Sequence, residues 1–137
     1  MLLEKNRLDI DTYLKLRKAV NWKTLTREQA ERAIQGSLFT VVAFDDRQAV
    51  GMGRIVGDGA VICYIQDLIV IPEYQGSGIG QQIMEHLIDY VKGMKLPDTE
   101  IMLDLMCAVG REEFYKKYGF IARPTEKLGP GMIMYIE

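Results

Sequence analysis

A glycine-rich segment, QGSGIG at residues 75–80, is the part of this sequence whose residue types and spacing best suit chemistry. It follows an apolar run that ends at Pro72 and precedes a helical pattern, so we expect it between a strand and a helix. Glycines permit tight turns and let a ligand approach the backbone closely. The free N–H groups at a helix start, together with the helix dipole, favour an anion such as phosphate. The segment therefore predicts a phosphate-binding helix entry.

Two familiar nucleotide-binding motifs do not fit this segment. A Walker loop requires GxxxxGK[ST], which the sequence lacks. A dinucleotide fingerprint requires GxGxxG, but counting from Gly76 puts Gln81 at the third glycine, and counting from Gly78 puts Ile83 there. The pattern that does match is Q-x-x-G-x-G, which starts at Gln75.

Two aspartates interrupt apolar runs that we expect to be strands: Asp67 in YIQDLIVI and Asp104 in IMLDLM. A carboxylate inside a buried sheet is costly unless it is paired or its pKa is raised. Each aspartate is therefore a candidate general base, acting directly or through water. Each is equally a candidate for an ion pair or for a hydrogen bond to a neighbouring loop, and the sequence does not choose between the two residues.

The elements that must position these residues follow from hydrophobic periodicity and turn residues. Asp9 and Thr26 are predicted N-caps of two helices, and a third, amphipathic helix is expected over 79–94. The predicted strands are 38–44, 48–56, 60–71, 101–109, 118–123 and 132–136, with a further short strand at 1–5 and a short helix at 111–117. The fold class is therefore α/β, with a mixed, mostly antiparallel sheet, one parallel strand pair and helices on both faces.

Length and composition narrow the class of protein. The chain has 137 residues, a length that predicts a single domain over 1–137. Its 48% hydrophobic and 26% charged residues argue against disorder. Its formal charge of −2 argues against binding to nucleic acids or to anionic membranes. No run of 18 apolar residues occurs, so we expect no membrane span. Cys63 and Cys107 are expected to be buried free thiols, and the single His86 argues against a zinc site. We expect a cytoplasmic protein.

The chain resembles the GCN5-related N-acetyltransferases. The resemblance is carried by V-x-P-E-Y-Q-G-x-G-I-G at 70–80 between a strand and a helix, by F-Y-K-K-Y-G-F at 114–120, by two N-terminal helices and by the strand meander. It covers nearly the whole length and implies a sheet whose parallel strand pair splays apart to hold acetyl-CoA as co-substrate. The family often carries Arg or Lys within the loop and an Asn after the fifth strand, and this chain has neither.

The resemblance also implies roles for individual residues. Backbone amides of the loop would hold the CoA pyrophosphate, and the strand before it would pair with the pantetheine arm. Tyr115 would protonate the departing CoA sulfur, and Asp67, Asp104 or a water chain would accept the proton of the attacking amine. The cofactor-binding set is Leu68, Ile69, Val70, Gln75, Gly76, Ser77, Gly78, Ile79, Gly80 and Gln81.

The resemblance implies direct attack of a neutral amine on the thioester in a ternary complex. The compact chain favours the primary amine of a small molecule. A protein or peptide amine is the alternative, as is a regulatory module that binds acyl-CoA without turnover. The apolar run at 132–136 could extend a sheet across subunits, which is compatible with a homodimer.

Overall fold

The computed structural model describes all residues 1–137, and the chain forms two compact units, residues 1–105 and 106–137. The prediction of a single domain over 1–137 stays a prediction. The first unit holds the whole sheet and the three longer helices, and the second holds one short helix.

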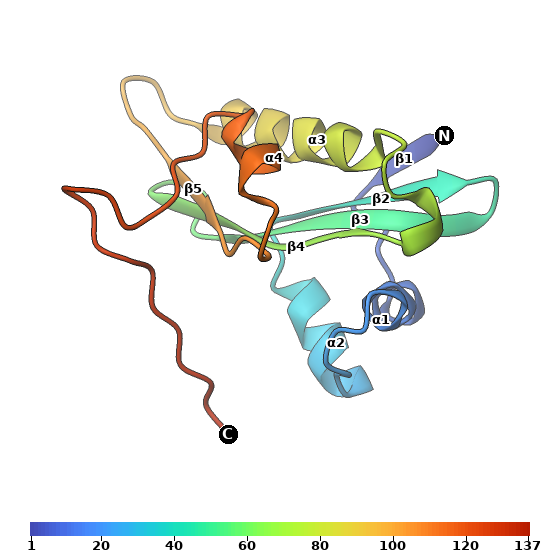
Figure 1. Cartoon of the computed structure of the whole chain (residues 1–137). Helices are drawn as coiled ribbons and strands as arrows, with labels where there is room; N and C mark the ends of the chain where they lie inside the picture. Colours follow the sequence, from blue (N-terminus) through green and yellow to red (C-terminus); the bar gives the residue numbers. More distant parts are fainter. The chain divides into compact units, whose positions relative to one another are not determined.

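The first unit is built on a five-stranded sheet (Figure 1). The strands lie side by side in chain order, antiparallel except for the last pair, which is parallel. The predicted fold class is therefore confirmed. The strands are β1 (Leu2–Lys5), β2 (Phe39–Asp45), β3 (Gln48–Gly57), β4 (Ile62–Val70) and β5 (Met102–Leu105).

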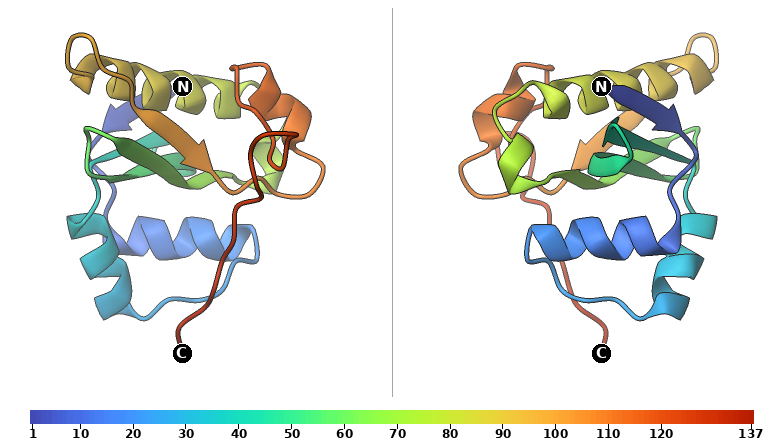
Figure 2. Two further views of the ribbon diagram at one scale, coloured as in Figure 1. Left: turned by 90° about the vertical axis from the view of Figure 1, so that its left-hand side faces the viewer. Right: turned by 90° about the vertical axis from the view of Figure 1, so that its right-hand side faces the viewer.

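Helices cover both faces of this sheet, with α1 (Ile10–Ala19) and α2 (Arg27–Gln35) on one side and α3 (Ile79–Met94) on the other (Figure 2). Both predicted caps are present: the Asp9 carboxylate accepts from the Thr12 N–H at 2.8 Å, and the Thr26 hydroxyl accepts from the Gln29 N–H at 3.1 Å. The bounds of α3 are those that the amphipathic pattern predicted. A short 3-10 turn, Pro72–Tyr74, separates β4 from the glycine-rich segment.

Two glycines in β3 allow α3 to pack closely on the sheet. A Cβ on Gly53 would lie 2.7 Å from Ile83 and 2.8 Å from Leu87, and a Cβ on Gly51 would lie 3.0 Å from Ile83. Because side chains alternate along a strand, the neighbouring residue Arg54 must point to the opposite face, where α1 and α2 lie.

The second unit differs most from the sequence-based expectation. Its one helix is α4 (Glu112–Lys116), and the two strands predicted at 118–123 and 132–136 are wrong, since neither forms. A strand needs a neighbour for its N–H and C=O groups. After residue 120 the only backbone hydrogen bond joins the Thr125 N–H to the Leu128 carbonyl.

Three smaller predictions can also be compared with the structure. The strand predicted at 101–109 is shortened to β5, because the Arg111 N–H donates to the Ala108 carbonyl in a turn that ends the extended run. Both cysteines are free thiols; Cys63 is buried as predicted, whereas Cys107 is exposed, so its predicted burial is wrong. None of the helices combines the length and the apolar character that crossing a membrane requires.

Candidate functional site

The glycine-rich segment opens α3 in a conformation that requires glycine. Gly76 and Gly78 have φ angles of 80° and 88°, in the left-handed region that other residues rarely adopt. Gly78 is the N-cap of α3, and no side chain caps the helix. The first helical hydrogen bond runs from the Gln82 N–H to the Gly78 carbonyl, so the three N–H groups of residues 79–81 have no partner within the helix. These groups can receive an anion.

Side chains at the beginning of the segment hold it against the end of the sheet. The Tyr74 hydroxyl donates to the Asp45 carboxylate at the end of β2, and the Gln75 side-chain amide donates to the Val70 carbonyl at 2.9 Å. The Ser77 hydroxyl donates to the Tyr74 carbonyl. The Ser77 hydroxyl is therefore engaged within the loop, which leaves its backbone N–H as its contribution to a ligand.

Strand β4 pairs with β5 over only part of its length. The parallel register joins Ile62–Ile65 to Met102–Leu105, and β4 then continues to Val70 with no strand on that side. A register shift in the β3–β4 ladder falls near Gln66, where the β4–β5 pairing stops. The second half of β4 therefore presents an open edge next to the glycine-rich segment, as the resemblance implies.

The direction of the backbone groups along this edge follows from one hydrogen bond. The Ile71 N–H donates to the Val50 carbonyl of β3 at 3.0 Å, so Ile71 points its backbone groups at β3. Successive residues of a strand alternate in this respect, so Ile69 also faces β3, whereas Leu68 and Val70 face the open edge. Of the three residues predicted to pair with pantetheine, Leu68 and Val70 are thus placed to do so, and Ile69 is not.

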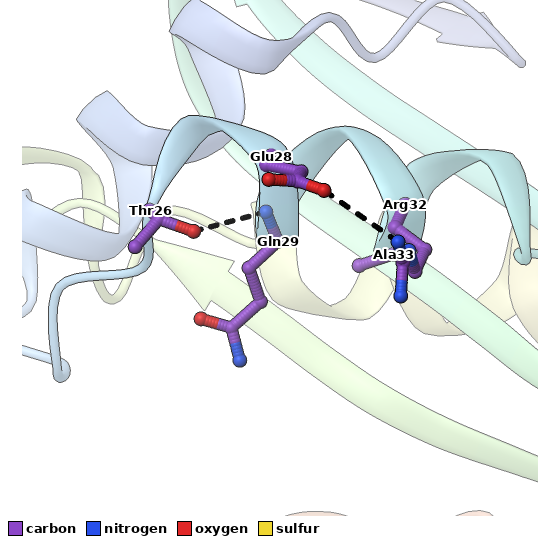
Figure 3. A pocket seen from close by; sticks show the side chains of 5 residues that line it. All are labelled: Thr26, Glu28, Gln29, Arg32 and Ala33. Carbon is purple, nitrogen blue, oxygen red and sulfur yellow. Dashed lines mark hydrogen bonds and ion pairs between the residues drawn. The ribbon is translucent and has the colours of Figure 1, made fainter.

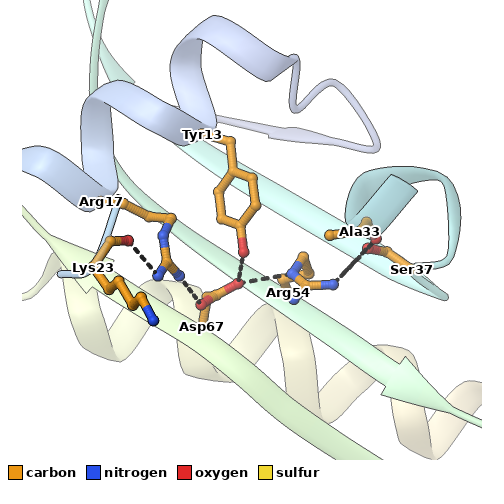
Figure 4. A network of polar contacts seen from close by, with 7 residues as sticks. All are labelled: Tyr13, Arg17, Lys23, Ala33, Ser37, Arg54 and Asp67. Carbon is orange, nitrogen blue, oxygen red and sulfur yellow. Dashed lines mark hydrogen bonds and ion pairs between the residues drawn. The ribbon is translucent and has the colours of Figure 1, made fainter. Parts of the chain in front are cut away.

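Asp67 accepts three hydrogen bonds (Figure 4). Its side chain is fully buried, and one carboxylate oxygen accepts from the Tyr13 hydroxyl at 2.6 Å and from Arg54 Nε at 2.7 Å. The other oxygen accepts from Arg17 Nη1 at 3.4 Å. Burial, together with the charge and hydrogen bond of Asp67, raises the pKa of the Tyr13 hydroxyl, which keeps it a donor. These contacts are those of an ion-paired carboxylate.

The two arginines extend this network to the N-terminal helices. Arg54 Nη1 donates to the Ala33 carbonyl at 3.2 Å and to the Ser37 hydroxyl at 3.1 Å, at the end of α2. Arg17 Nη2 donates to the Lys23 carbonyl at 2.9 Å, in the segment between α1 and α2. Asp67 therefore fixes both helices and their connection to β3 and β4.

The partners of Asp67 were not predicted from the sequence. Arg54 is the one charge inside the otherwise apolar run QAVGMGRIV, so it was available as a signal for a buried ion pair. Tyr13 and Arg17 are four positions apart on α1 and therefore lie on one helical face. That face could have been recognised as polar within a buried layer.

Asp104 has a different environment. One of its carboxylate oxygens is buried with no hydrogen-bond partner, and burial raises the pKa of the group. Asp104 is in register with Tyr64, and the preceding pair along the two strands is Cys63 with Leu103. The Cys63 thiol contacts the sulfur of Met94 in α3 at 3.8 Å, so Asp104 must lie on the opposite face of the sheet, the face of α1 and α2. A desolvated, unpaired carboxylate has the properties of a general base.

Tyr115 lies on α4 in the second unit. Its half-buried ring packs edge-to-face against Phe114 at 5.1 Å and Phe120 at 6.0 Å between centroids. Burial raises the pKa of its hydroxyl, Cys107 adds to the increase and Arg111 opposes it. The hydroxyl is therefore protonated at neutral pH, as a general acid must be.

A pocket of about 430 Å³ lies along α2, and none of the site residues predicted from the sequence lines it (Figure 3). It is lined by Thr26, Glu28, Gln29, Arg32 and Ala33, all at or within one helix. Its charged pair, Glu28 and Arg32, is exposed and 3.6 Å apart. No group of three or more His, Cys, Asp or Glu side chains is arranged to hold a metal ion.

Comparison with known proteins agrees with this geometry. A probable acetyltransferase from meticillin-resistant Staphylococcus aureus is 32% identical, with a TM-score of 0.83, over 98% of this chain and 100% of that one. A GNAT-family acetyltransferase from Streptococcus pneumoniae is 30% identical, with a TM-score of 0.82, over 98% and 97%. An uncharacterised ycf52-like N-acetyltransferase of Prochlorococcus marinus is 24% identical over 85% of this chain.

The chain spans between 29% and 65% of the length of the curated relatives that it matches. The model of the acetyltransferase (GNAT) domain matches residues 11–134, which is most of the chain and includes the open edge of β4, the glycine-rich segment and Tyr115. The resemblance noted in the sequence is thereby confirmed, and the chain belongs to the GNAT acetyltransferase family.

Proposed function

We propose that this protein is an acetyl-CoA-dependent N-acetyltransferase that acetylates the primary amine of a small molecule. The observation that carries the proposal is the pair of left-handed glycines, Gly76 and Gly78, which open α3 beside the unpaired end of β4. An uncapped helix start suits a pyrophosphate, and an open strand edge suits an arm that carries amide groups. Family membership supports the same cofactor.

The cofactor would be held mainly by backbone groups. Amides of residues 75–81 would bind the pyrophosphate, since the loop offers no Lys or Arg side chain. Leu68 and Val70 would pair with the pantetheine arm through the edge that faces away from β3. An N–H on that edge would also polarise the thioester carbonyl, as donors of an oxyanion hole do.

Acetyl transfer requires two proton transfers. The neutral amine attacks the thioester carbon, a C–N bond forms, and the C–S bond breaks to release the CoA thiolate. We propose that Asp104 accepts the proton of the amine, because its unpaired oxygen and its raised pKa suit a general base. Asp67 suits that role less well, because two arginines and a tyrosine already use both of its oxygens. We propose that Asp67 instead anchors α1 to the sheet.

Tyr115 would supply the proton to the thiolate. Its raised pKa keeps the hydroxyl protonated at neutral pH, so that it can donate to the CoA thiolate as that group leaves. The two free thiols, Cys63 and Cys107, suit a reducing compartment, and we propose the cytoplasm as the location.

The test is the melting temperature of the protein with and without acetyl-CoA, with NADH and ATP as controls. A ligand at 100 times its dissociation constant adds about 2.7 kcal/mol, which raises the melting temperature of a domain of this size by several degrees. A rise with acetyl-CoA alone, followed by amine-dependent release of CoA thiol, is expected. If acetyl-CoA did not raise the melting temperature, the proposed cofactor site would be wrong. A rise without thiol release from any small or peptide amine would favour the regulatory module.

A further inference from the structure

Two buried side-chain atoms have no hydrogen-bond partner: the Nε of Arg17 and one carboxylate oxygen of Asp104. A buried donor or acceptor without a partner is costly, so each such atom in a native structure needs an explanation. The two atoms are complementary, because the guanidinium offers a positively charged N–H and the carboxylate offers a negatively charged acceptor. Both residues belong to the first compact unit, residues 1–105.

The two groups also lie on one face of the sheet. Arg17 extends from α1 to the carboxylate of Asp67, which β4 presents to that helix (Figure 4). Asp104 of β5 points to the same face and is in register with Tyr64. Asp67 comes three residues after Tyr64 in β4, so about 10 Å of strand lies between the positions of the two aspartates. A small molecule a few bonds long can span this interval.

The network around Asp67 carries more positive than negative charge. Arg54 pairs with one Asp67 oxygen at 2.7 Å, which balances that carboxylate, whereas Arg17 reaches the other oxygen only at 3.4 Å. Neither arginine forms an ion pair with any other carboxylate. The raised pKa of Tyr13 keeps its hydroxyl neutral. The guanidinium of Arg17 is therefore a largely buried positive charge without a counter-ion of its own.

Two aromatic rings hold the Arg17 guanidinium in place. Its central carbon lies 5.6 Å from the centroid of the Tyr13 ring and 5.4 Å from the centroid of the Trp22 ring. The Arg17 side chain is 13% exposed and Trp22 is 38% exposed, so solvent still reaches this part of the surface. Guanidinium groups bind carboxylates and phosphates through parallel N–H bonds. A fixed and partly accessible guanidinium with an unused Nε–H suits such an oxyanion.

We propose that the acceptor amine also carries an oxyanion, a carboxylate or a phosphate, and that Arg17 binds this oxyanion while the amine faces Asp104. The proposal rests on the proposed acetyltransferase function, because it names the substrate class of that site. One substrate molecule would then supply a partner to both unpaired atoms. An amine without an oxyanion would leave the Arg17 Nε unpaired, and sites with buried polar groups reject analogues that leave those groups unpaired.

The first test is acetyl transfer to amines that differ in the oxyanion. γ-Aminobutyrate and ε-aminocaproate are compared with butylamine and hexylamine, in which a methyl group replaces the carboxylate, and phosphoethanolamine is compared with ethanolamine. We expect kcat/KM to be at least about 10-fold higher for the anionic amine in one kind of pair, as a charged hydrogen bond provides. The carboxylate and phosphate pairs show which oxyanion the site takes. Equal or lower values for the anionic amine in every pair would overturn the proposal while leaving the acetyltransferase function intact.

Variants show whether Arg17 is responsible for the preference. Arg17→Gln removes the positive charge and should abolish the preference for the anionic amine, and Arg17→Lys, which lacks the planar guanidinium, should retain only part of it. Both amines are measured on one sample, so a smaller folded fraction does not change their ratio. Arg27→Gln is the matched control, because Arg27 is 64% exposed and pairs with Asp11 on the surface. It should keep the wild-type preference. A preference that survives Arg17→Gln would overturn the proposal.

Binding without turnover separates this proposal from the acetyltransferase function. Calorimetric titration with γ-aminobutyrate and with phosphoethanolamine, in the absence and in the presence of CoA, requires no acetyl transfer. If the chain acetylated no amine, the acetyltransferase function would be wrong, but binding of either probe that weakens at least about 10-fold in Arg17→Gln would still support the oxyanion site. No binding of either probe, or equal binding by the wild type and Arg17→Gln, would overturn the oxyanion site.

Discussion

Replacing Asp67 by Asn tests whether this carboxylate anchors the N-terminal helices. The substitution keeps the shape but removes the charge that two guanidinium groups share. The carboxylate of Asp67 is fully buried, and the Arg54 side chain is only 8% exposed. In the variant, this buried arginine would remain charged beside a neutral amide. Removing one partner of a buried ion pair costs about 3–5 kcal/mol. For a domain of this size, such a loss lowers the melting temperature by about 10 °C or more.

Asp104→Asn is the matched control, because it makes the same change at a carboxylate whose buried oxygen has no partner. Burial raises the pKa of Asp104 above its ordinary value of 3.8. When the pKa of a carboxyl group is higher in the folded chain than in the unfolded chain, the folded state is favoured at pH values below the unfolded-state pKa. This contribution to stability is lost as the pH rises through the folded-state pKa. At pH 7 the neutral Asn should therefore match or exceed the wild type in melting temperature, and the difference should close below about pH 3.8.

The assay is urea and thermal unfolding of the three proteins at pH 7, followed by circular dichroism. Asp67→Asn within about 1 kcal/mol of the wild type, well below the cost of breaking a buried pair, would refute the anchoring role. An equal loss of stability in Asp104→Asn would refute the contrast between the two sites. The rate of thiol release separates the roles in a second way, because Asp104→Asn should lose turnover while it keeps its stability.

Three further outcomes follow from the geometry. Gly78→Ala should abolish the rise in melting temperature with acetyl-CoA and cost about 1–2 kcal/mol of stability, because alanine disfavours the left-handed backbone. Gly93→Ala, in the last turn of α3, should keep the rise. Tyr115→Phe should lower the rate of thiol release about 100-fold or more with little change in cofactor affinity, and an unchanged rate would leave the ring a packing role only. The Asp58 carboxylate accepts from three N–H groups of residues 60–62, which lowers its pKa. Asp58→Ala should therefore lower the melting temperature at pH 7, by an amount that shrinks as the pH falls through the lowered pKa; a gap that does not depend on pH would contradict this.

The parts of the fold that depend on nearby residues could be predicted from the sequence. The helix over 79–94 and the caps at Asp9 and Thr26 follow from periodicity and from side chains that bond within three residues. The meander also follows, because its turns are short and its strands are neighbours in the chain. A strand whose partner is distant cannot be predicted in this way, which is why the run at 132–136 has strand-forming residues but no strand.

The different environments of Asp67 and Asp104 could not be predicted either. Both aspartates interrupt apolar runs in similar ways, so their own neighbours in sequence do not distinguish them. The difference arises across the sheet, where Asp67 is in register with Arg54 and Asp104 is in register with Tyr64. Register depends on the paired strand and on the shift near Gln66, neither of which a single sequence specifies.

Strand β4 serves two purposes through different atoms. The side chain of Asp67 points to the face of α1, while the backbone groups of Leu68 and Val70 point along the sheet to the open edge. The β3 ladder holds this backbone independently of the buried ion pair. Folded Asp67→Asn should therefore still show a rise in melting temperature with acetyl-CoA, from a lower starting value. If the rise disappeared while Asp104→Asn kept it, the ion pair would have to shape the cofactor edge as well, and the separation of side-chain and backbone roles along β4 would be wrong.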